Sequence, residues 1–193
     1  MSLSYAFFAL ISRMKYIHRW SLMRNTSLEN IQEHSHMVAV LAHALAVLHN
    51  RYFGGQVDPG AVALAALYHD APEILTGDMP TPIKYYSPEL ESSYKAVEAV
   101  SCQKLLNMLP DDLTDIYRPL LQQDDPEIHL LVKAADKLSA YLKCVEERKA
   151  GNLEFRQAEA QTLSALKSYP LPALNYFMTH FLPAFELTLD ELE

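Results

Sequence analysis

The chain has 193 residues, of which 50% are hydrophobic and 21% are charged, and its formal net charge is −8. This balance is typical of a globular domain long enough to bury a core without structural staples. An acidic chain lacks the positive field that grips a nucleic-acid backbone, which excludes a nucleic-acid polymer as the expected partner. A small anionic substrate would need a local positive centre, either a metal or an arginine.

The two cysteines, Cys102 and Cys144, belong to no disulfide or metal-binding motif, which favours a reducing, cytoplasmic compartment. An apolar run over residues 5–11 is too short to cross a bilayer and lacks the basic leader of a signal peptide. We therefore expect a soluble cytoplasmic protein with no membrane partner.

Helical periodicity recurs along the chain, and no run alternates as a strand would, so the predicted fold class is all-α. A first amphipathic helix is expected over 2–15 and irregular backbone over 18–30. A long helix over 30–51 should carry one apolar stripe and end at a pair of glycines.

The next helix is expected over 60–70, with Pro59 at its first position. A proline deep inside a helix breaks a backbone hydrogen bond. Pro72 therefore predicts that His69 and Asp70 lie near a helix end or kink.

Residues 76–82 should form a proline-stiffened loop. The chain contains neither repeats nor a low-complexity linker, so residues 1–193 are expected to form a single helical domain. Further helices are predicted at 88–108, 111–121, 126–150, 152–167 and 172–190.

His69 and Asp70 end an otherwise apolar helix. An ionised carboxylate in that setting is costly to desolvate unless a cation or hydrogen bonds compensate. The alternative is that Asp70 merely caps the turn that Pro72 forces.

Small side chains surround Asp136 and leave room for a group to approach its carboxylate. An exposed aspartate paired with Lys133 or Lys137 is the alternative. His34 lies on the apolar side of the helix predicted over 30–51, where a lone histidine is more often a core residue than a ligand.

Together, His34, His69, Asp70 and Asp136 supply two imidazoles and two carboxylates. Such a mixed set suits one divalent cation with positions left open for water and phosphate. Between the His-Asp pair and the last aspartate the chain offers only His129, which favours one metal rather than two.

This order of a histidine, a His-Asp pair and a distant aspartate on helices resembles the HD-domain phosphohydrolases. Further segments resemble the bacterial 5′-deoxynucleotidase branch of that superfamily, over nearly the whole chain. They are residues 19–25, 33–35, 68–70, 75–85 and 140–144.

The resemblance implies an HD-domain helical bundle that binds one divalent cation, Co²⁺, Mn²⁺ or a similar ion, and a homodimer. It implies hydrolysis of 2′-deoxyribonucleoside 5′-monophosphates to deoxyribonucleoside and phosphate, with little base preference. The cation would lower the pKa of its bound water, which then attacks the phosphate.

The resemblance assigns catalytic roles to two residues. Glu73 would be the general acid/base, and its alternative is a glutamate that faces solvent. Arg19 would orient the phosphate with its planar fork, which lysine cannot reproduce, and its alternative is a surface residue.

The substrate would also contact the proline-stiffened loop. Asp78 could accept a hydrogen bond from the sugar 3′-hydroxyl and leave no room for a 2′-hydroxyl; an Asx turn is the alternative. The substrate-binding residues that the resemblance implies are Arg19, Trp20, Asp70, Asp78, Met79, Pro80 and Thr81.

Two other functions compete with this interpretation. An HD-type phosphodiesterase or nucleoside polyphosphate hydrolase would call for extra metal ligands or a basic channel, and the sequence indicates neither. A helical scaffold with a vestigial metal site would have no need of Arg19, Glu73 and Asp78.

Overall fold

The computed structural model describes residues 4–84 and 86–192. Within these residues every regular element is a helix, apart from one isolated antiparallel bridge between His18 and Asn30. The expected all-α fold class is confirmed. The α-helices and 3₁₀ helices (η) are α1 (Phe7–Ile11), η1 (Ser12–Tyr16), α2 (Ile31–Phe53), α3 (Pro59–Tyr68), α4 (Glu73–Thr76), α5 (Thr81–Lys84), α6 (Pro88–Leu106), α7 (Asp111–Leu121), α8 (Pro126–Lys149), η2 (Leu153–Phe155), α9 (Arg156–Lys167), α10 (Pro172–His180), η3 (Leu182–Glu186) and η4 (Leu189–Glu191).

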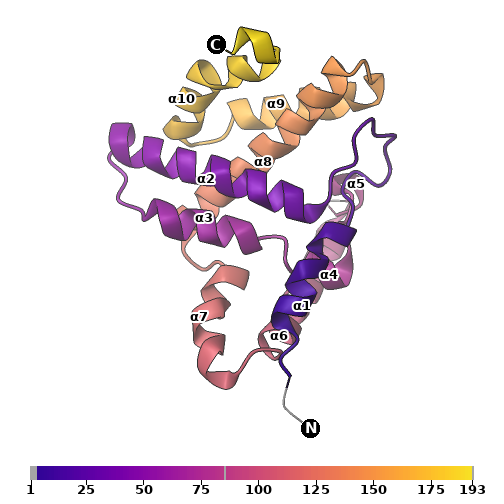
Figure 1. Ribbon diagram of the computed structural model, residues 1–193, viewed down its shortest axis with the longest axis vertical. Coiled ribbons are helices and arrows are strands. Elements are labelled where there is room, and N and C mark those ends of the chain that lie inside the picture. The colour runs from indigo at the N-terminus through magenta and orange to yellow at the C-terminus, as the bar shows by residue number, and fades with distance from the viewer. Residues whose placement is uncertain (1–3, 85, 193) are drawn as a thin grey trace.

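The helices α2, α3 and α8 form the centre of the molecule. Figure 1 shows α2 and α3 side by side, with α8 crossing behind them, and each of the three contacts the other two. The helices α9 and α10 cover one end of this centre, and α1, α6 and α7 lie at the opposite end.

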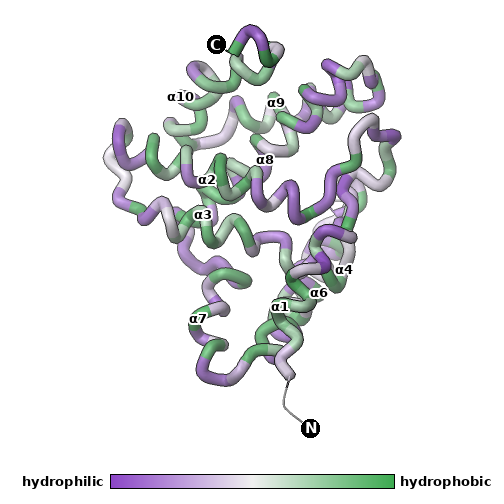
Figure 2. The backbone as a smooth tube through the Cα atoms, in the orientation of Figure 1, coloured by the Kyte–Doolittle hydropathy of each residue, from purple (hydrophilic) through white to green (hydrophobic). Residues whose placement is uncertain are grey.

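Two clusters of buried apolar side chains hold these helices together. The larger cluster joins α2, α3, α8 and α10 and includes Leu45, Val62 and Leu138, all fully buried. The smaller joins α1, α6 and α7 around Phe7 and Leu105. Burial of each such side chain stabilises the fold by about 1.5–3 kcal/mol. In Figure 2, hydrophobic and hydrophilic residues alternate along α2 and α8, as expected for helices that bury one face.

Local signals explain where α2 begins and ends. The Asn30 side chain accepts hydrogen bonds from the backbone amides of Gln32 and Glu33 and so caps the first turn. Gly54 ends the helix with a left-handed φ of 77°, a conformation that glycine adopts without strain.

The helical conformation is interrupted between α3 and α4, where the sequence predicted a helix end. His69 follows the last residue of α3, and Pro72 immediately precedes α4. His69 and Asp70 therefore lie at a helix end, as predicted. Glu73 begins a new helix rather than continuing the face of His69, because Pro72 cannot donate the backbone hydrogen bond that a continuous helix needs.

The N-terminal helix differs from the one predicted over 2–15. Ser2 and Leu3 lie outside the described residues, and so does Tyr85 of the segment 75–85. Within the described part, the α-helix gives way after Ile11 to a 3₁₀ helix that reaches Tyr16.

Two other predicted boundaries were wrong. The loop expected over 76–82 is shorter, because α5 begins at Thr81 and accommodates Pro82 in its first turn. The helix expected over 172–190 ends at His180, because Pro183 cannot continue an α-helix, and two 3₁₀ helices follow.

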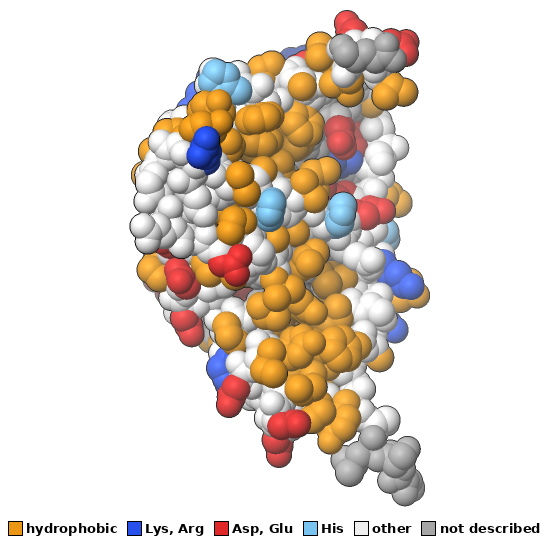
Figure 3. All heavy atoms as spheres, turned by 60° about the vertical axis from the view of Figure 1, so that its left-hand side comes forward, with side chains coloured by type: hydrophobic (Ala, Val, Ile, Leu, Met, Phe, Trp, Pro, Cys, Tyr) orange, Lys and Arg blue, Asp and Glu red, His pale blue; other side chains and the backbone are white. Residues whose placement is uncertain are grey.

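Some properties of the surface and of the cysteines bear on the sequence-based expectations. Among the described residues, no helix combines the length and apolarity that crossing a bilayer requires. Cys102 and Cys144 are buried and free. Figure 3 shows hydrophobic side chains gathered in a band down one face of the molecule.

Candidate functional site

Three side chains from different parts of the chain form a compact group that could hold a metal. His34 comes from α2, His69 follows α3, and Asp136 comes from α8. Their ligand atoms all lie within 4.8 Å of one another. His34 Nε2 is 3.1 Å from Asp136 Oδ1, and the centroids of the two imidazole rings are 5.3 Å apart. The close packing of α2, α3 and α8 thus brings distant residues together.

His69 presents a nitrogen lone pair to this group. Its Nδ1 lies 2.7 Å from the carbonyl oxygen of Ala66, which can only accept, so Nδ1 carries the proton. Burial lowers the pKa of His69, which favours the neutral imidazole. The lone pair is then on Nε2, which is buried and has no hydrogen-bond partner among the described residues. An orphaned buried nitrogen beside a carboxylate fits a cation ligand.

His34 is fully buried, and its two ring nitrogens face different groups. Nε2 faces Asp136, whereas Nδ1 lies 3.2 Å from the hydroxyl oxygen of Ser139. Ser139 is one of the small side chains that surround Asp136 in the sequence. Its position three residues later on α8 allows it to orient the imidazole.

Asp70 borders the same group. Its Oδ1 lies 3.2 Å from His69 Nε2, and its Oδ2 lies 3.5 Å from His34 Nε2. The carboxylate also accepts a hydrogen bond from Arg19, at 3.4 Å from Nη1. A side chain that faces two imidazoles and a guanidinium argues against the alternative of a simple turn cap.

Arg19 is not a surface residue, because its side chain is only 12% exposed. It pairs with Asp70 through Nη1 and with Glu29 through Nε, at 3.0 Å. Burial alone would lower the pKa of Arg19, but the surrounding carboxylates, led by Asp70 and Asp136, raise it. The guanidinium therefore keeps its charge beside the candidate metal ligands.

Trp20 adopts a backbone conformation that is rare for its residue type. Its φ of 58° is the only positive φ among the described residues that are not glycine. The indole Nε1 donates a hydrogen bond of 2.9 Å to Glu29 Oε2, and the ring packs on Phe155 with centroids 5.2 Å apart. Such local strain persists where surrounding contacts fix it.

The sequence analysis missed Glu29. Its contacts with Arg19 and Trp20 depend on the antiparallel pairing of two irregular segments, in which Arg19 N donates to Glu29 O at 2.9 Å. No helical or strand periodicity signals that pairing. A glutamate just before the helix cap Asn30 is otherwise an ordinary surface residue.

Glu73 is 8% exposed, which excludes the alternative of a glutamate that faces solvent. Its Oε2 is buried and has no hydrogen-bond partner among the described residues. Burial, reinforced by the nearby charges of Asp70 and Asp78, raises the pKa of Glu73 to about 10. A raised pKa favours the protonated carboxylic acid, which is the form that can donate a proton.

Asp78 follows Gly77, whose φ of 74° makes the turn after α4. The carboxylate is half-buried, and burial raises the pKa of Asp78, while Arg19 opposes this effect and Asp70 adds to it. These influences place Asp78 in the electrostatic neighbourhood of Arg19, as a substrate-binding role would require.

The other loop residues predicted to bind substrate lie further out. Pro80 is half-buried, and Thr81, the first residue of α5, is exposed. Met79 lines a hollow of about 540 Å³ that it shares with residues of α6 such as Leu90 and Val97. The structure thus brings together Arg19, Trp20, His34, His69, Asp70, Glu73, Asp78 and Asp136, and leaves Met79, Pro80 and Thr81 at the edge.

Comparison with known proteins yields one consistent family. The sequence profile of the 5′-deoxynucleotidase YfbR-like family matches residues 6–185. The 5′-deoxynucleotidase of Vibrio cholerae serotype O1 is 51% identical over 188 residues, which cover 96% of this chain and 97% of that protein. The 5′-deoxynucleotidase YfbR of Salmonella typhi is 50% identical over 188 residues, or 96% of this chain and 94% of that protein.

A solved structure confirms the expected HD-domain fold. The HD-domain phosphohydrolase lin2634 from Listeria innocua superposes with a TM-score of 0.81 at 25% identity. The superposition covers 93% of this chain and 87% of that protein.

Proposed function

The chain belongs to the 5′-deoxynucleotidase YfbR-like family, and from this premise we propose that His34, His69 and Asp136 mark the site where it hydrolyses 2′-deoxyribonucleoside 5′-monophosphates. The chain is an enzyme, a phosphoric monoester hydrolase, and the products are a deoxyribonucleoside and phosphate. One observation carries the proposal: metal-ligand atoms from three helical regions gather within 4.8 Å of one another, next to the ion pair of Asp70 and Arg19.

We propose His34, His69, Asp70 and Asp136 as the ligands of one divalent cation, Co²⁺, Mn²⁺ or a similar ion. The orphaned Nε2 of His69 and the mix of imidazole and carboxylate donors support this ligand set. When bound, the cation would supply an activated water and neutralise charge on the phosphoryl oxygens.

Arg19 would bind the phosphate through its guanidinium. Nη1 points at Asp70, so the fork faces the proposed ligands rather than solvent. A planar fork can donate two parallel hydrogen bonds to a phosphate and fix its orientation. Glu29 occupies Nε and Asp70 accepts one hydrogen bond from Nη1, so Nη2 and the second hydrogen of Nη1 are left to donate to the substrate.

Glu73 would hold a proton on its carboxyl group and deliver it to the leaving 5′-oxygen of the sugar. The raised pKa, about 10, supports this role because an ionised carboxylate has no proton to give. The burial that raises the pKa also excludes bulk water from the carboxyl group.

Trp20 and Asp78 would bind the sugar. The charges of Arg19 and Asp70 influence the pKa of Asp78. Asp78 therefore lies near the residues proposed to bind phosphate and metal, where it could accept a hydrogen bond from the sugar 3′-hydroxyl. We include Asp70, Met79, Pro80 and Thr81 among the substrate contacts. Because the sequence contains no aromatic cluster or amide constellation that points to one base, we propose little base preference.

We further propose that residues 1–193 form one domain and that the protein is a cytoplasmic homodimer. The hydrophobic band of Figure 3 supports association, because monomers rarely expose large apolar areas. Exposed apolar residues at helical spacing occur on two central helices: Val40 and Val47 on α2, and Leu64 and Leu67 on α3. Light scattering coupled to gel filtration tests the dimer.

The activity is tested by phosphate release from dAMP, AMP and dATP, with and without a chelator and added Co²⁺, Mn²⁺ or Mg²⁺. We expect release from dAMP that the chelator abolishes and a divalent ion restores. Release of intact triphosphate from dATP would instead favour the polyphosphate hydrolase. Cleavage of bis-p-nitrophenyl phosphate would favour the phosphodiesterase, and no release from any substrate would favour the scaffold.

A further inference from the structure

We propose that Glu29 is a positioning residue that holds Arg19 and Trp20 in one fixed arrangement for substrate binding. The inference deepens the proposed function and rests on it. Glu29 is not one of the proposed metal ligands, and its Oε1 lies 3.9 Å from His34 Nδ1, which is beyond hydrogen-bonding distance.

A single carboxylate oxygen joins the two residues. Glu29 Oε2 accepts one hydrogen bond from Arg19 Nε, at 3.0 Å, and another from Trp20 Nε1, at 2.9 Å. Two donors on one acceptor fix the guanidinium and the indole relative to each other. Because the pairing with Arg19 is charge-assisted, it is stronger than a neutral hydrogen bond.

The backbone reinforces this arrangement. Arg19 N donates to Glu29 O at 2.9 Å, and Ile31 N donates to Ile17 O at 2.9 Å. These bonds clamp residues 17–19 against residues 29–31 immediately before Trp20 takes its left-handed conformation. The backbone pairing therefore fixes the position of Glu29, and the Glu29 side chain in turn holds the indole of Trp20.

The segment that carries Glu29 is itself anchored to α8. Glu147 is 1% exposed and accepts hydrogen bonds from Thr26, from N at 2.9 Å and from Oγ1 at 2.6 Å. Lys143 also donates to Glu147. Since α8 carries Asp136 as well, the anchor ties Glu29 to a helix that supplies a proposed metal ligand.

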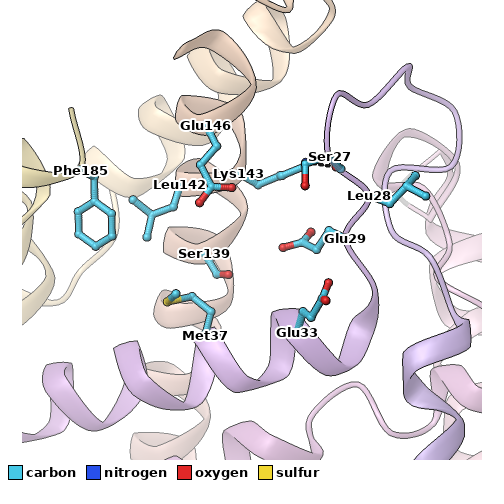
Figure 4. A pocket seen from close by; sticks show the side chains of 10 residues that line it. All are labelled: Ser27, Leu28, Glu29, Glu33, Met37, Ser139, Leu142, Lys143, Glu146 and Phe185. Atoms are coloured by element: carbon cyan, nitrogen blue, oxygen red, sulfur yellow. Dashed lines mark hydrogen bonds between the residues drawn. The ribbon is translucent and has the colours of Figure 1, made fainter. Parts of the chain in front are cut away.

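Glu29 also lines a pocket of about 190 Å³, to which α8 contributes Lys143 and Glu146. Figure 4 shows Glu29 and Glu33 on the same wall of this pocket, with Lys143 and Glu146 opposite. Arg19 and Trp20 direct their side-chain hydrogen bonds to Glu29 and Asp70, not to Glu33. Glu33 is exposed and is a matched control for a change of charge at this pocket.

Trp20 allows the contact to be observed without turnover, because it is the only tryptophan of the chain. Loss of the Glu29 hydrogen bond should free the indole. In Glu29→Ala we expect stronger acrylamide quenching and a shifted emission, with the metal content unchanged. Glu33→Gln should leave the fluorescence as in the wild type.

Kinetics with dAMP then test the positioning role. We expect Glu29→Ala to lower kcat/KM by about tenfold or more. Glu29→Gln should recover part of the loss, because the amide oxygen still accepts from the indole. In an Arg19→Ala background the same Glu29 substitutions should lower kcat/KM less than in the wild type, because only the contact with Trp20 is then left to lose.

Three outcomes distinguish the possible failures. Absence of dAMP hydrolysis by the wild type would reject the proposed function itself. Wild-type kinetics and fluorescence in Glu29→Ala, or a cycle in which the Arg19 and Glu29 effects simply add, would overturn the inference alone. If Glu29→Ala does not fold, the same cycle with Glu29→Gln decides the question.

Discussion

Nη1 of Arg19 lies 3.4 Å from Oδ2 of Asp70, so the residue proposed to bind phosphate touches a residue proposed to bind the metal. This contact joins the irregular segment before α2 to the turn after α3. A substitution at either position therefore acts next to the other, and the roles are separable only when metal retention and turnover are measured together.

Arg19→Ala should leave the metal bound and lower turnover of dAMP by about a hundredfold, because the charge on the phosphate loses a donor. Arg19→Lys should recover only a small part of the lost turnover, since an ammonium group cannot form the parallel pair of hydrogen bonds with the phosphate. Metal analysis and steady-state kinetics on the same preparations check both statements. Full activity of Arg19→Ala would refute the assignment of Arg19 to the phosphate.

Asp136→Ala should abolish both metal retention and turnover, because it removes a carboxylate from a group whose ligand atoms lie within 4.8 Å of one another. His129 lies on the same helix, α8, but is exposed. His129→Ala is therefore a matched control and should keep metal and activity. Retention of a stoichiometric divalent ion by Asp136→Ala would contradict the ligand set.

Glu73→Gln should keep the fold and the metal but lower kcat by about 10²–10⁴, the range expected for loss of a general acid/base. The amide matches the shape of a neutral carboxylic acid, which is the form favoured by a pKa of about 10. Circular dichroism, metal content and kcat measured in parallel separate folding from chemistry. A kcat within a few-fold of the wild type would leave Glu73 without its proposed role.

The sequence pointed to the proposed ligands more clearly than to the residues proposed to orient the site. His34, His69 and Asp136 stand out because polar side chains on apolar helix faces are costly unless something compensates. Glu29 carries no such signal, because its contacts arise from the pairing of two irregular segments. Ser139 is recognisable from the sequence only as a small residue near Asp136, because a serine hydroxyl finds a hydrogen-bond partner in many settings.

Helix boundaries followed the same division between local and long-range causes. The start of α2 and the break at Pro72 were predictable from capping and proline chemistry. The helix predicted over 172–190 was too long, because the prediction followed apolar periodicity and gave too little weight to Pro183. The burial of Glu73 was not predictable, because it depends on the tertiary packing around the turn after α3 rather than on local sequence.

Asp78→Ala should reduce the preference for dAMP over AMP as well as the affinity for dAMP. The carboxylate is proposed to accept from the 3′-hydroxyl and to crowd a 2′-hydroxyl, so its removal costs one contact and relieves one clash. The ratio of kcat/KM for dAMP to that for AMP is the measurement. If both values fell by the same factor, Asp78 would not determine sugar specificity.

Glu147→Ala should destabilise the fold by about 3–5 kcal/mol at pH 7, the cost of leaving one partner of a buried ion pair alone. Lys143 would lose its carboxylate while only 4% exposed. Replacement of both residues by apolar ones, Lys143→Met with Glu147→Leu, should cost much less. Urea denaturation of the single and double variants provides the comparison.

The same carboxylate makes a pH-dependent prediction. Burial would raise the pKa of Glu147, but hydrogen bonds from Lys143, Thr26 and Asn152 outweigh it and hold the pKa below its ordinary value. A carboxyl group with a depressed pKa in the folded state stabilises the fold above its unfolded pKa, about 4.3, and loses that contribution as the pH falls. The stability difference between wild type and Glu147→Ala should therefore be constant above about pH 6 and narrow from about pH 5 toward pH 3. A difference that stayed constant over the whole acid range would mean that the ion pair does not stabilise the fold through its charge.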